Sequence, residues 1–171
     1  MFIFAPSPAG EGWGEGKTLD MQHNQTKSLR QRALEYLGKR EYSYHELGQK
    51  LKTYAEETDD ISAILEDFKT RGWLSDKRFT DQLVHARQVK FGSAKVANEL
   101  RQKGVADNLI SNALVSLKEN ELENATEVWR KKFKAPANNR DEWAKQARFL
   151  QSRGFGFDVI KKVLNLTTED E

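Results

Sequence analysis

The feature that most constrains the fold is a spacing of apolar residues and glycine that the chain repeats. In residues 100–114 and 150–164, a leucine is followed by glycine four residues later, by isoleucine after ten and by leucine after fourteen. The same spacings of ten and fourteen separate Leu51, Ile61 and Leu65. Three occurrences about 50 residues apart indicate a tandem array of small units.

The pattern around each glycine predicts two helices joined by a sharp turn. Apolar residues at helical spacing lie on both sides of it. Gly104 and Gly154 stand where a helix would end in the left-handed conformation, which glycine adopts without strain. In the first copy Ala55 takes the place of glycine, so we expect its turn to be built differently. The stretch Ser43-Tyr-His-Glu46 predicts a capping box at the start of the preceding helix.

A further amphipathic helix precedes each pair, so we predict an all-α, elongated tandem array of three three-helix units. The units are expected over residues 25–74, 75–120 and 121–166, and each is too small to bury its apolar face without a neighbour. We expect a disordered, glycine-rich N-terminal extension over residues 1–24 and an acidic tail over residues 167–171. The residues assigned to the structural frame are Leu51, Ile61, Leu65, Gly72, Trp73, Phe79, Leu100, Gly104, Ile110, Leu114, Leu150, Gly154, Ile160 and Leu164.

The residue types argue against catalytic chemistry. The 171 residues include no cysteine, no apolar run long enough for a bilayer, and 3 histidines at unrelated places. Neighbouring carboxylates such as Glu56 and Glu57 point to different sides of a helix, so they do not form an opposed acid/base pair. No phosphate-binding glycine loop follows a strand. We therefore expect a cytoplasmic protein that is not an enzyme and has no catalytic, metal-binding or cofactor-binding residues.

Positive charge is concentrated in one part of the chain. Residues 21–165 carry 27 Lys or Arg against 20 Asp or Glu, and the excess lies in the last two thirds. Gathered on one face, these cations would attract a polyanion such as nucleic acid, or an acidic groove in a protein. Dispersed, they would be ordinary solvated helix residues, and both interpretations stay open. The second helices of the pairs use alternate positions for packing, so sequence-specific reading of DNA bases is not expected.

Three motifs carry a family resemblance. The motif Arg71-Gly-Trp-Leu-Ser-Asp-Lys-Arg-Phe79, the frame from Leu100 and the closing Arg153-Gly-Phe-Gly-Phe-Asp-Val-Ile-Lys-Lys-Val-Leu164 resemble the RecX family of regulators of the RecA recombinase. The resemblance covers about residues 28–165. It implies a non-catalytic protein that lies in the groove of the RecA–DNA filament and lowers its ATPase, strand-exchange and coprotease activities. It would do so by blocking the groove or promoting disassembly, in DNA repair, homologous recombination and the SOS response.

The basic residues of the last two units are the candidate contacts with this partner, the RecA nucleoprotein filament. Trp73 and Phe79 are expected to pack at a unit junction instead. We expect a monomer that binds single- and double-stranded DNA weakly and no membrane. The alternative is a sequence-tolerant DNA-binding helical repeat protein that acts by competition for DNA. The candidate contacts are Arg87, Lys90, Lys95, Arg101, Lys103, Arg130, Lys131, Lys132, Arg148, Arg153, Lys161 and Lys162.

Overall fold

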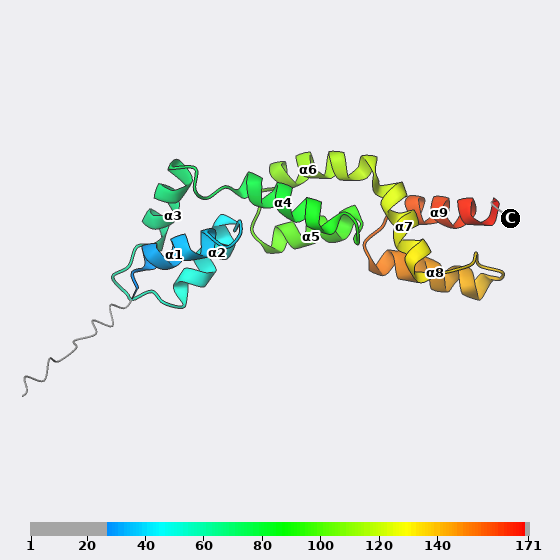
Figure 1. The fold of residues 1–171 in the computed structure, drawn as a ribbon, viewed down its shortest axis with the longest axis horizontal. Helices are drawn as coiled ribbons and strands as arrows, with labels where there is room; N and C mark the ends of the chain where they lie inside the picture. The colour runs from blue at the N-terminus through cyan, green and yellow to red at the C-terminus, as the bar shows by residue number, and fades with distance from the viewer. Residues whose placement is uncertain (1–26, 170–171) are drawn as a thin grey trace, which may run out of the picture.

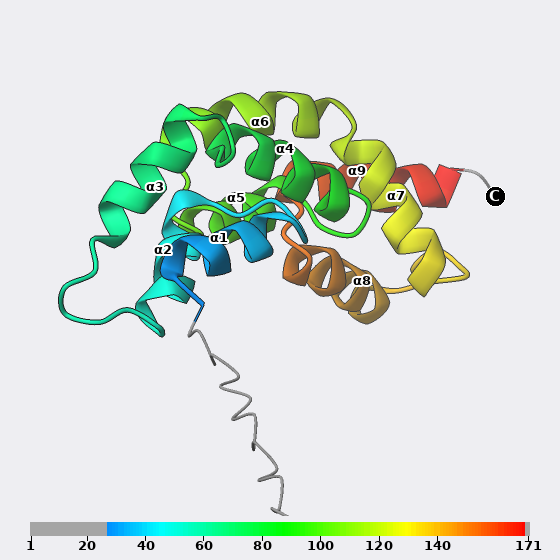
Figure 2. The same ribbon diagram turned by 60° about the vertical axis from the view of Figure 1, so that its left-hand side comes forward.

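The computed structural model describes residues 27–169, which form nine helices and no strand. The helices follow one another in three groups along an elongated molecule, and α6 leads directly into α7 (Figures 1 and 2). The predicted fold class, an all-α array of three three-helix units, is therefore confirmed. The helices are α1 (Leu29–Leu37), α2 (Tyr44–Lys52), α3 (Ile61–Thr70), α4 (Asp76–Arg87), α5 (Ser93–Gln102), α6 (Asp107–Glu119), α7 (Glu121–Lys132), α8 (Arg140–Ser152) and α9 (Phe157–Glu169).

Two of the sequence-based expectations concern residues near the ends of the chain. The extension predicted for residues 1–24 lies outside the described residues. The backbone of α9 continues to Glu169, so it enters the range of the predicted acidic tail, but the side chains of residues 167–171 are outside the description.

Side-chain caps fix where several helices begin. Ser28 and Gln31 form a reciprocal capping box at α1, and Asp60 accepts a hydrogen bond from the backbone N–H of Ala63 at α3. At α2 only half of the predicted box forms. Ser43 accepts from the backbone N–H of Glu46 at 3.0 Å, but the Glu46 carboxylate turns away to bind two cations. The prediction of a box at Ser43 was wrong because charged partners outside the helix compete for that carboxylate.

Each group of helices has its own apolar core. The three clusters centre on Leu47 and Phe68, on Val96 and Leu100, and on Leu150 and Val163. Such separate cores are typical of arrays in which each unit contacts only its neighbours.

Most residues of the structural frame are buried in these cores. Leu114 and Ile61 are only partly buried, and Leu117, almost one turn beyond Leu114, is fully buried instead. Phe79 is buried, whereas Trp73 is 44% exposed and lies edge-on against Phe68 at a centroid distance of 5.4 Å. The spacing rule therefore identifies the correct helical face but not the depth of every residue on it.

Two structural features favour glycine at positions 104 and 154 of the frame. Gly104 and Gly154 have φ of 72° and 88°, which is the left-handed region predicted for them. Each also touches the preceding unit, because a Cβ built on Gly104 would lie 2.4 Å from the Cβ of His45, and one on Gly154 would lie 2.4 Å from the Cβ of Lys95. In the first copy Ala55 does not adopt the left-handed conformation, so its turn is built differently, as expected.

Candidate functional site

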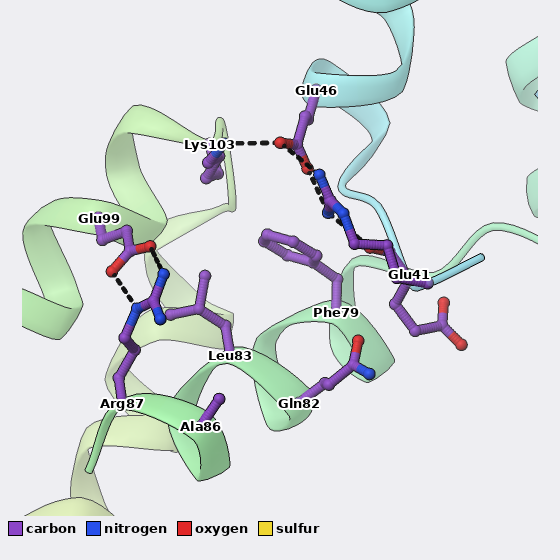
Figure 3. Close-up of a pocket in the computed structure, with 10 residues that line it drawn as sticks. Glu41, Glu46, Phe79, Gln82, Leu83, Ala86, Arg87, Glu99 and Lys103 are labelled. Atoms are coloured by element: carbon purple, nitrogen blue, oxygen red, sulfur yellow. Dashed lines mark hydrogen bonds and ion pairs between the residues drawn. The ribbon is translucent and has the colours of Figure 1, made fainter. Parts of the chain in front are cut away.

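The molecule has a hollow at its first junction, where the first and second groups of helices meet. It has a volume of about 410 Å³, and Phe79, Leu83 and Ala86 of α4 supply its apolar wall (Figure 3). Its charged lining comes from α2, from the chain before it, and from α4 and α5. The three cations that line the hollow are Arg40, Arg87 and Lys103.

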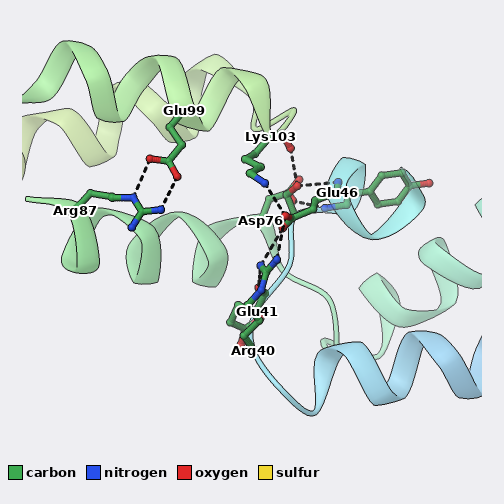
Figure 4. Close-up of polar contacts among 9 residues, drawn as sticks. Arg40, Glu41, Glu46, Asp76, Arg87, Glu99 and Lys103 are labelled. Carbon is green, nitrogen blue, oxygen red and sulfur yellow. Dashed lines mark hydrogen bonds and ion pairs between the residues drawn. The ribbon is translucent and has the colours of Figure 1, made fainter. Parts of the chain in front are cut away.

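Each of these cations is paired with a carboxylate (Figure 4). Glu46 accepts two hydrogen bonds of 3.0 Å from Arg40 and one of 2.6 Å from Lys103. Arg87 donates to both oxygens of Glu99 at 2.9 Å. Because the charges are neutralised within the hollow, the first junction is built as a joint and has little free charge to offer a ligand.

The two carboxylates respond to these surroundings in the same direction. Burial raises the pKa of Glu46, but hydrogen bonds from Arg40 and Lys103 outweigh it and hold the pKa below its ordinary value. The hydrogen bonds from Arg87 lower the pKa of Glu99, against a smaller effect of burial. Both groups are therefore held in the charged form by their partners.

Hydrogen bonds to the backbone complete the first junction. The Ser43 hydroxyl donates to the carbonyl of Lys103 at 2.5 Å, and the backbone N–H of Tyr44 donates to Asp76 at 2.7 Å. The start of α2 is thus fastened both to the turn after α5 and to the start of α4.

The second junction, between the second and third groups, repeats this geometry. The backbone N–H of Gly92, at the start of α5, donates to the carbonyl of Arg153 at 2.9 Å, and that of Ala94 donates to Gly154 at 3.3 Å. The buried carboxylate of Glu121 accepts from the backbone N–H of Ser93 at 2.7 Å. Lys103 and Arg153 are both the C-cap residues of their helices, so the same part of each unit contacts the unit before it.

The cations at the second junction meet aromatic rings and carbonyl groups in place of carboxylates. The guanidinium of Arg153 lies 5.5 Å from the ring centroid of Phe91 and 5.2 Å from that of Phe149. The ammonium of Lys95 lies 4.6 Å from the Phe91 ring and donates to the Ser152 carbonyl at 3.4 Å. Such contacts are attractive but leave the positive charge in place.

Beside this junction lies a second hollow, of about 310 Å³, which we call the basic depression. Its apolar lining is Val89, Val128 and Phe149, and no Asp or Glu of residues 27–166 lines it. Its cations come from three places: the turn after α4, the last turn of α7 and the end of α8. On α7 the lining residues are spaced by three and four positions, which places them on one face. The cations are Lys90, Lys131, Lys132 and Arg153.

The basic depression gathers four of the twelve predicted contacts. Four others are engaged in ion pairs: Arg87 with Glu99, Arg101 with Asp107, Lys103 with Glu46, and Arg130 with Glu127. Lys95 lies against Phe91, while Arg148, Lys161 and Lys162 are exposed and do not line the depression.

The apolar residues of this surface were not among those predicted from the sequence to contact a partner. Val89 follows the end of α4 and is 51% exposed. Nothing in its local sequence indicates that α7 and α8 approach it. The spacing of Val128, Lys131 and Lys132 was the available signal, because it places one valine and two lysines on the same side of a helix.

Residues 27–169 contain no group of three or more His, Cys, Asp or Glu side chains that could hold a metal ion. No helix in the same range is both long and apolar enough to cross a bilayer.

Comparison with known proteins gave consistent matches. A family model described as the second three-helix domain of RecX matches residues 75–114, and one described as the third three-helix domain of RecX matches residues 119–164. The protein named "Regulatory protein RecX" from Leptothrix cholodnii is 43% identical over 143 residues, which are 84% of this chain and 91% of that protein. The protein of the same name from Chromobacterium violaceum is 41% identical over 145 residues, 85% of this chain and 94% of that protein.

A solved structure agrees in fold. The crystal structure of RecX from Lactobacillus salivarius superimposes with a TM-score of 0.70 at 22% identity, covering 81% of this chain and 95% of that one.

Proposed function

The chain belongs to the RecX family of regulatory proteins, and from this premise we propose that it binds the RecA nucleoprotein filament and lowers its ATPase, strand-exchange and coprotease activities. The observation that best supports this proposal is the basic depression, where cations of two units converge and form no ion pair with a carboxylate of the described residues. The three lysines of the depression are exposed side chains. They are therefore available to a partner in a way that Arg87 and Lys103, held by Glu99 and Glu46, are not.

The elongated shape suits a polymeric target. A filament presents the same surface at each successive protomer, and an array of stacked units can contact more than one of them. Several weak contacts on one polymer add up to strong binding, because each one raises the local concentration for the next. We propose that the depression makes one such contact and that Lys103, through its ion pair with Glu46, mainly holds the first two units together.

Under this proposal, the protein would act as a cytoplasmic monomer without catalytic activity of its own. It would bind single- and double-stranded DNA only weakly, and its effect on DNA repair, homologous recombination and the SOS response would come from the filament.

The alternative is that the basic surface binds DNA directly and competes with RecA for it. Salt dependence separates the two, because binding to DNA alone weakens by about 0.7 to 0.9 log units per log unit of salt for each phosphate neutralised.

The test is the DNA-dependent ATPase rate of RecA with increasing amounts of this protein, beside its binding to bare single-stranded DNA at the same salt. Inhibition by substoichiometric protein that hardly binds the bare DNA supports the proposal. Inhibition only at amounts that coat the DNA supports the alternative.

A further inference from the structure

We propose that the basic depression is a docking site for an acidic peptide segment that carries one large apolar side chain. The inference rests on the proposed function in one respect, since the same surface serves both. It goes further by naming the chemistry of the contact: protein carboxylates around an apolar anchor, and not the phosphates and bases of a nucleic acid.

The floor of the depression calls for an apolar group. Val89 is about half exposed and Phe149 is partly exposed, whereas Val128 is only 7% exposed, so the accessible apolar surface comes mainly from Val89 and Phe149. The depression has a volume of about 310 Å³, which is at the lower end of the range for ligand pockets, roughly 300 to 1,000 Å³. An inserted side chain would remove this surface from water, which is favourable.

The rim calls for negative charge. Four cations surround the floor, and no carboxylate in the described part of the chain lines it. Two carboxylates of α7 are committed elsewhere, because Glu127 pairs with Arg130 and the buried Glu121 accepts from the backbone of Ser93. Carboxylates on a peptide would therefore meet unpaired cations on three sides, and this complementarity would orient the segment as it docks.

The aromatic groups of the depression do not favour nucleic acid. Bases stack on aromatic rings that offer a free face. The Phe149 ring is packed edge-to-face against Phe133 at 5.3 Å and lies under the guanidinium of Arg153 at 5.2 Å. The remaining floor is valine, which has no face for stacking. A nucleic acid could use the lysines but would leave the apolar floor unused.

The depression also depends on the second junction. Val89 and Lys90 lie between α4 and α5, whereas the other lining residues belong to α7 and α8. An occupant touching both sides would hold the two units in their stacked arrangement, because it would bind that arrangement better than any other.

The first experiment uses the isolated full chain and a fluorescent eight-residue probe in which Asp and Glu flank one Phe. Two comparison probes are the same peptide with Ala for Phe, and an oligothymidylate of equal charge at the same salt. Fluorescence anisotropy should show that the Phe peptide binds tighter than the Ala peptide. K131E with K132E should weaken the Phe peptide by about tenfold or more.

The matched control is K161E with K162E, which makes the same charge change on neighbouring exposed residues of α9 outside the depression. It should change peptide affinity by no more than about twofold. Equal losses for the two lysine pairs would overturn the proposal, as would equal binding of the Phe and Ala peptides or no binding of either.

A second pair of variants tests the apolar floor. Val89→Asp adds a negative charge that repels both peptides, and loss of the apolar contact should weaken the Phe peptide more than the Ala peptide; equal losses would overturn the apolar floor. Circular dichroism should be unchanged because Val89 is exposed. Val115→Asp is its control, since Val115 is also exposed but does not line the depression. If K131E with K132E bound oligothymidylate more weakly but bound the peptide as before, the depression would be a nucleic-acid site and the proposal would be overturned. Self-association that disappears in Val89→Asp would assign it to a second copy of the chain and also overturn it.

These assays contain no RecA. Failure of peptide binding is therefore distinct from failure of ATPase inhibition, and each result can be obtained without the other.

Discussion

The two junctions of the array share a backbone plan and differ in what they do with charge. In both, the C-cap residue of one unit, Lys103 or Arg153, offers its carbonyl to the N-cap residue of the unit before it, Ser43 or Gly92. At the first junction the Lys103 side chain pairs with Glu46. At the second, the Arg153 side chain lies against two phenylalanine rings and lines an open depression.

The difference shows which parts of the repeat are fixed by stacking. The glycine and the carbonyl contact set the geometry of the joint, so they appear at both junctions. The side chains around them can then either neutralise one another, which stabilises the array, or remain unpaired, which leaves charge for a partner.

Substitution of the junction glycines should have the largest effect. Gly104→Ala or Gly154→Ala combines positive φ with an overlap against the neighbouring unit, and we expect a loss of about 3 kcal/mol in the free energy of unfolding. Gly72→Ala is the control, since Gly72 has φ of 71° but nothing within 4 Å of the added Cβ, and should lose about 1 kcal/mol. Urea denaturation followed by circular dichroism measures both. Equal losses would mean that the close approach between units contributes nothing.

Removal of the Glu46 carboxylate, which joins the first two units, should have the next largest effect on the free energy of unfolding. The Glu46 side chain is only 12% exposed, and Glu46→Gln removes the anionic partner of Arg40 and Lys103. We expect a loss of about 2 kcal/mol in the free energy of unfolding. Glu127→Gln removes an exposed ion pair with Arg130 and should cost no more than about 0.5 kcal/mol. The same denaturation experiment compares them, and a smaller loss for Glu46 than for Glu127 would contradict the assignment of the first junction as an ionic joint.

Acid should weaken the first two units, which contain Glu46 and Glu99, before the third. The pKa values of Glu46 and Glu99 are lower in the folded protein than their ordinary values. Their contribution is therefore complete above the unfolded pKa, about 4.3, and is lost as the pH falls through the lower folded pKa. Hydrogen exchange between pH 5 and pH 3 should show α2 and α5 losing protection before α9. In E46Q with E99Q this part of the pH dependence should flatten, and an unchanged profile would show that other groups cause it.

The smallest effect on stability is expected at the basic depression. K131E with K132E alters two exposed lysines that take part in no ion pair in the described chain, so the free energy of unfolding should change by no more than about 0.5 kcal/mol. Lys103→Glu would place a second carboxylate beside Glu46 and should cost about 2 kcal/mol. Thermal unfolding of the two variants gives the comparison. A large loss for the Lys131 and Lys132 pair would mean that these residues hold the array together.

The sequence predicted the parts of this molecule that depend on local spacing. Helical periodicity and glycine placement were sufficient for the three units and for the left-handed turns at Gly104 and Gly154. The capping box at Ser43 formed only by half because Glu46 binds Arg40, six residues away, and Lys103, 57 residues away in the chain. Likewise, the spacing of the frame could not tell which cations form ion pairs within the described chain and which do not. Arg87 and Lys90 are three positions apart, yet one faces Glu99 and the other lines the depression.

The most direct test of the account is the RecA ATPase assay with wild-type protein and with K131E and K132E combined. The account predicts that wild-type protein inhibits at substoichiometric amounts and that the variant, equally stable, needs about tenfold more protein for the same inhibition. Equal inhibition by the two proteins would contradict the claim that the open surface at the second junction is where the partner binds.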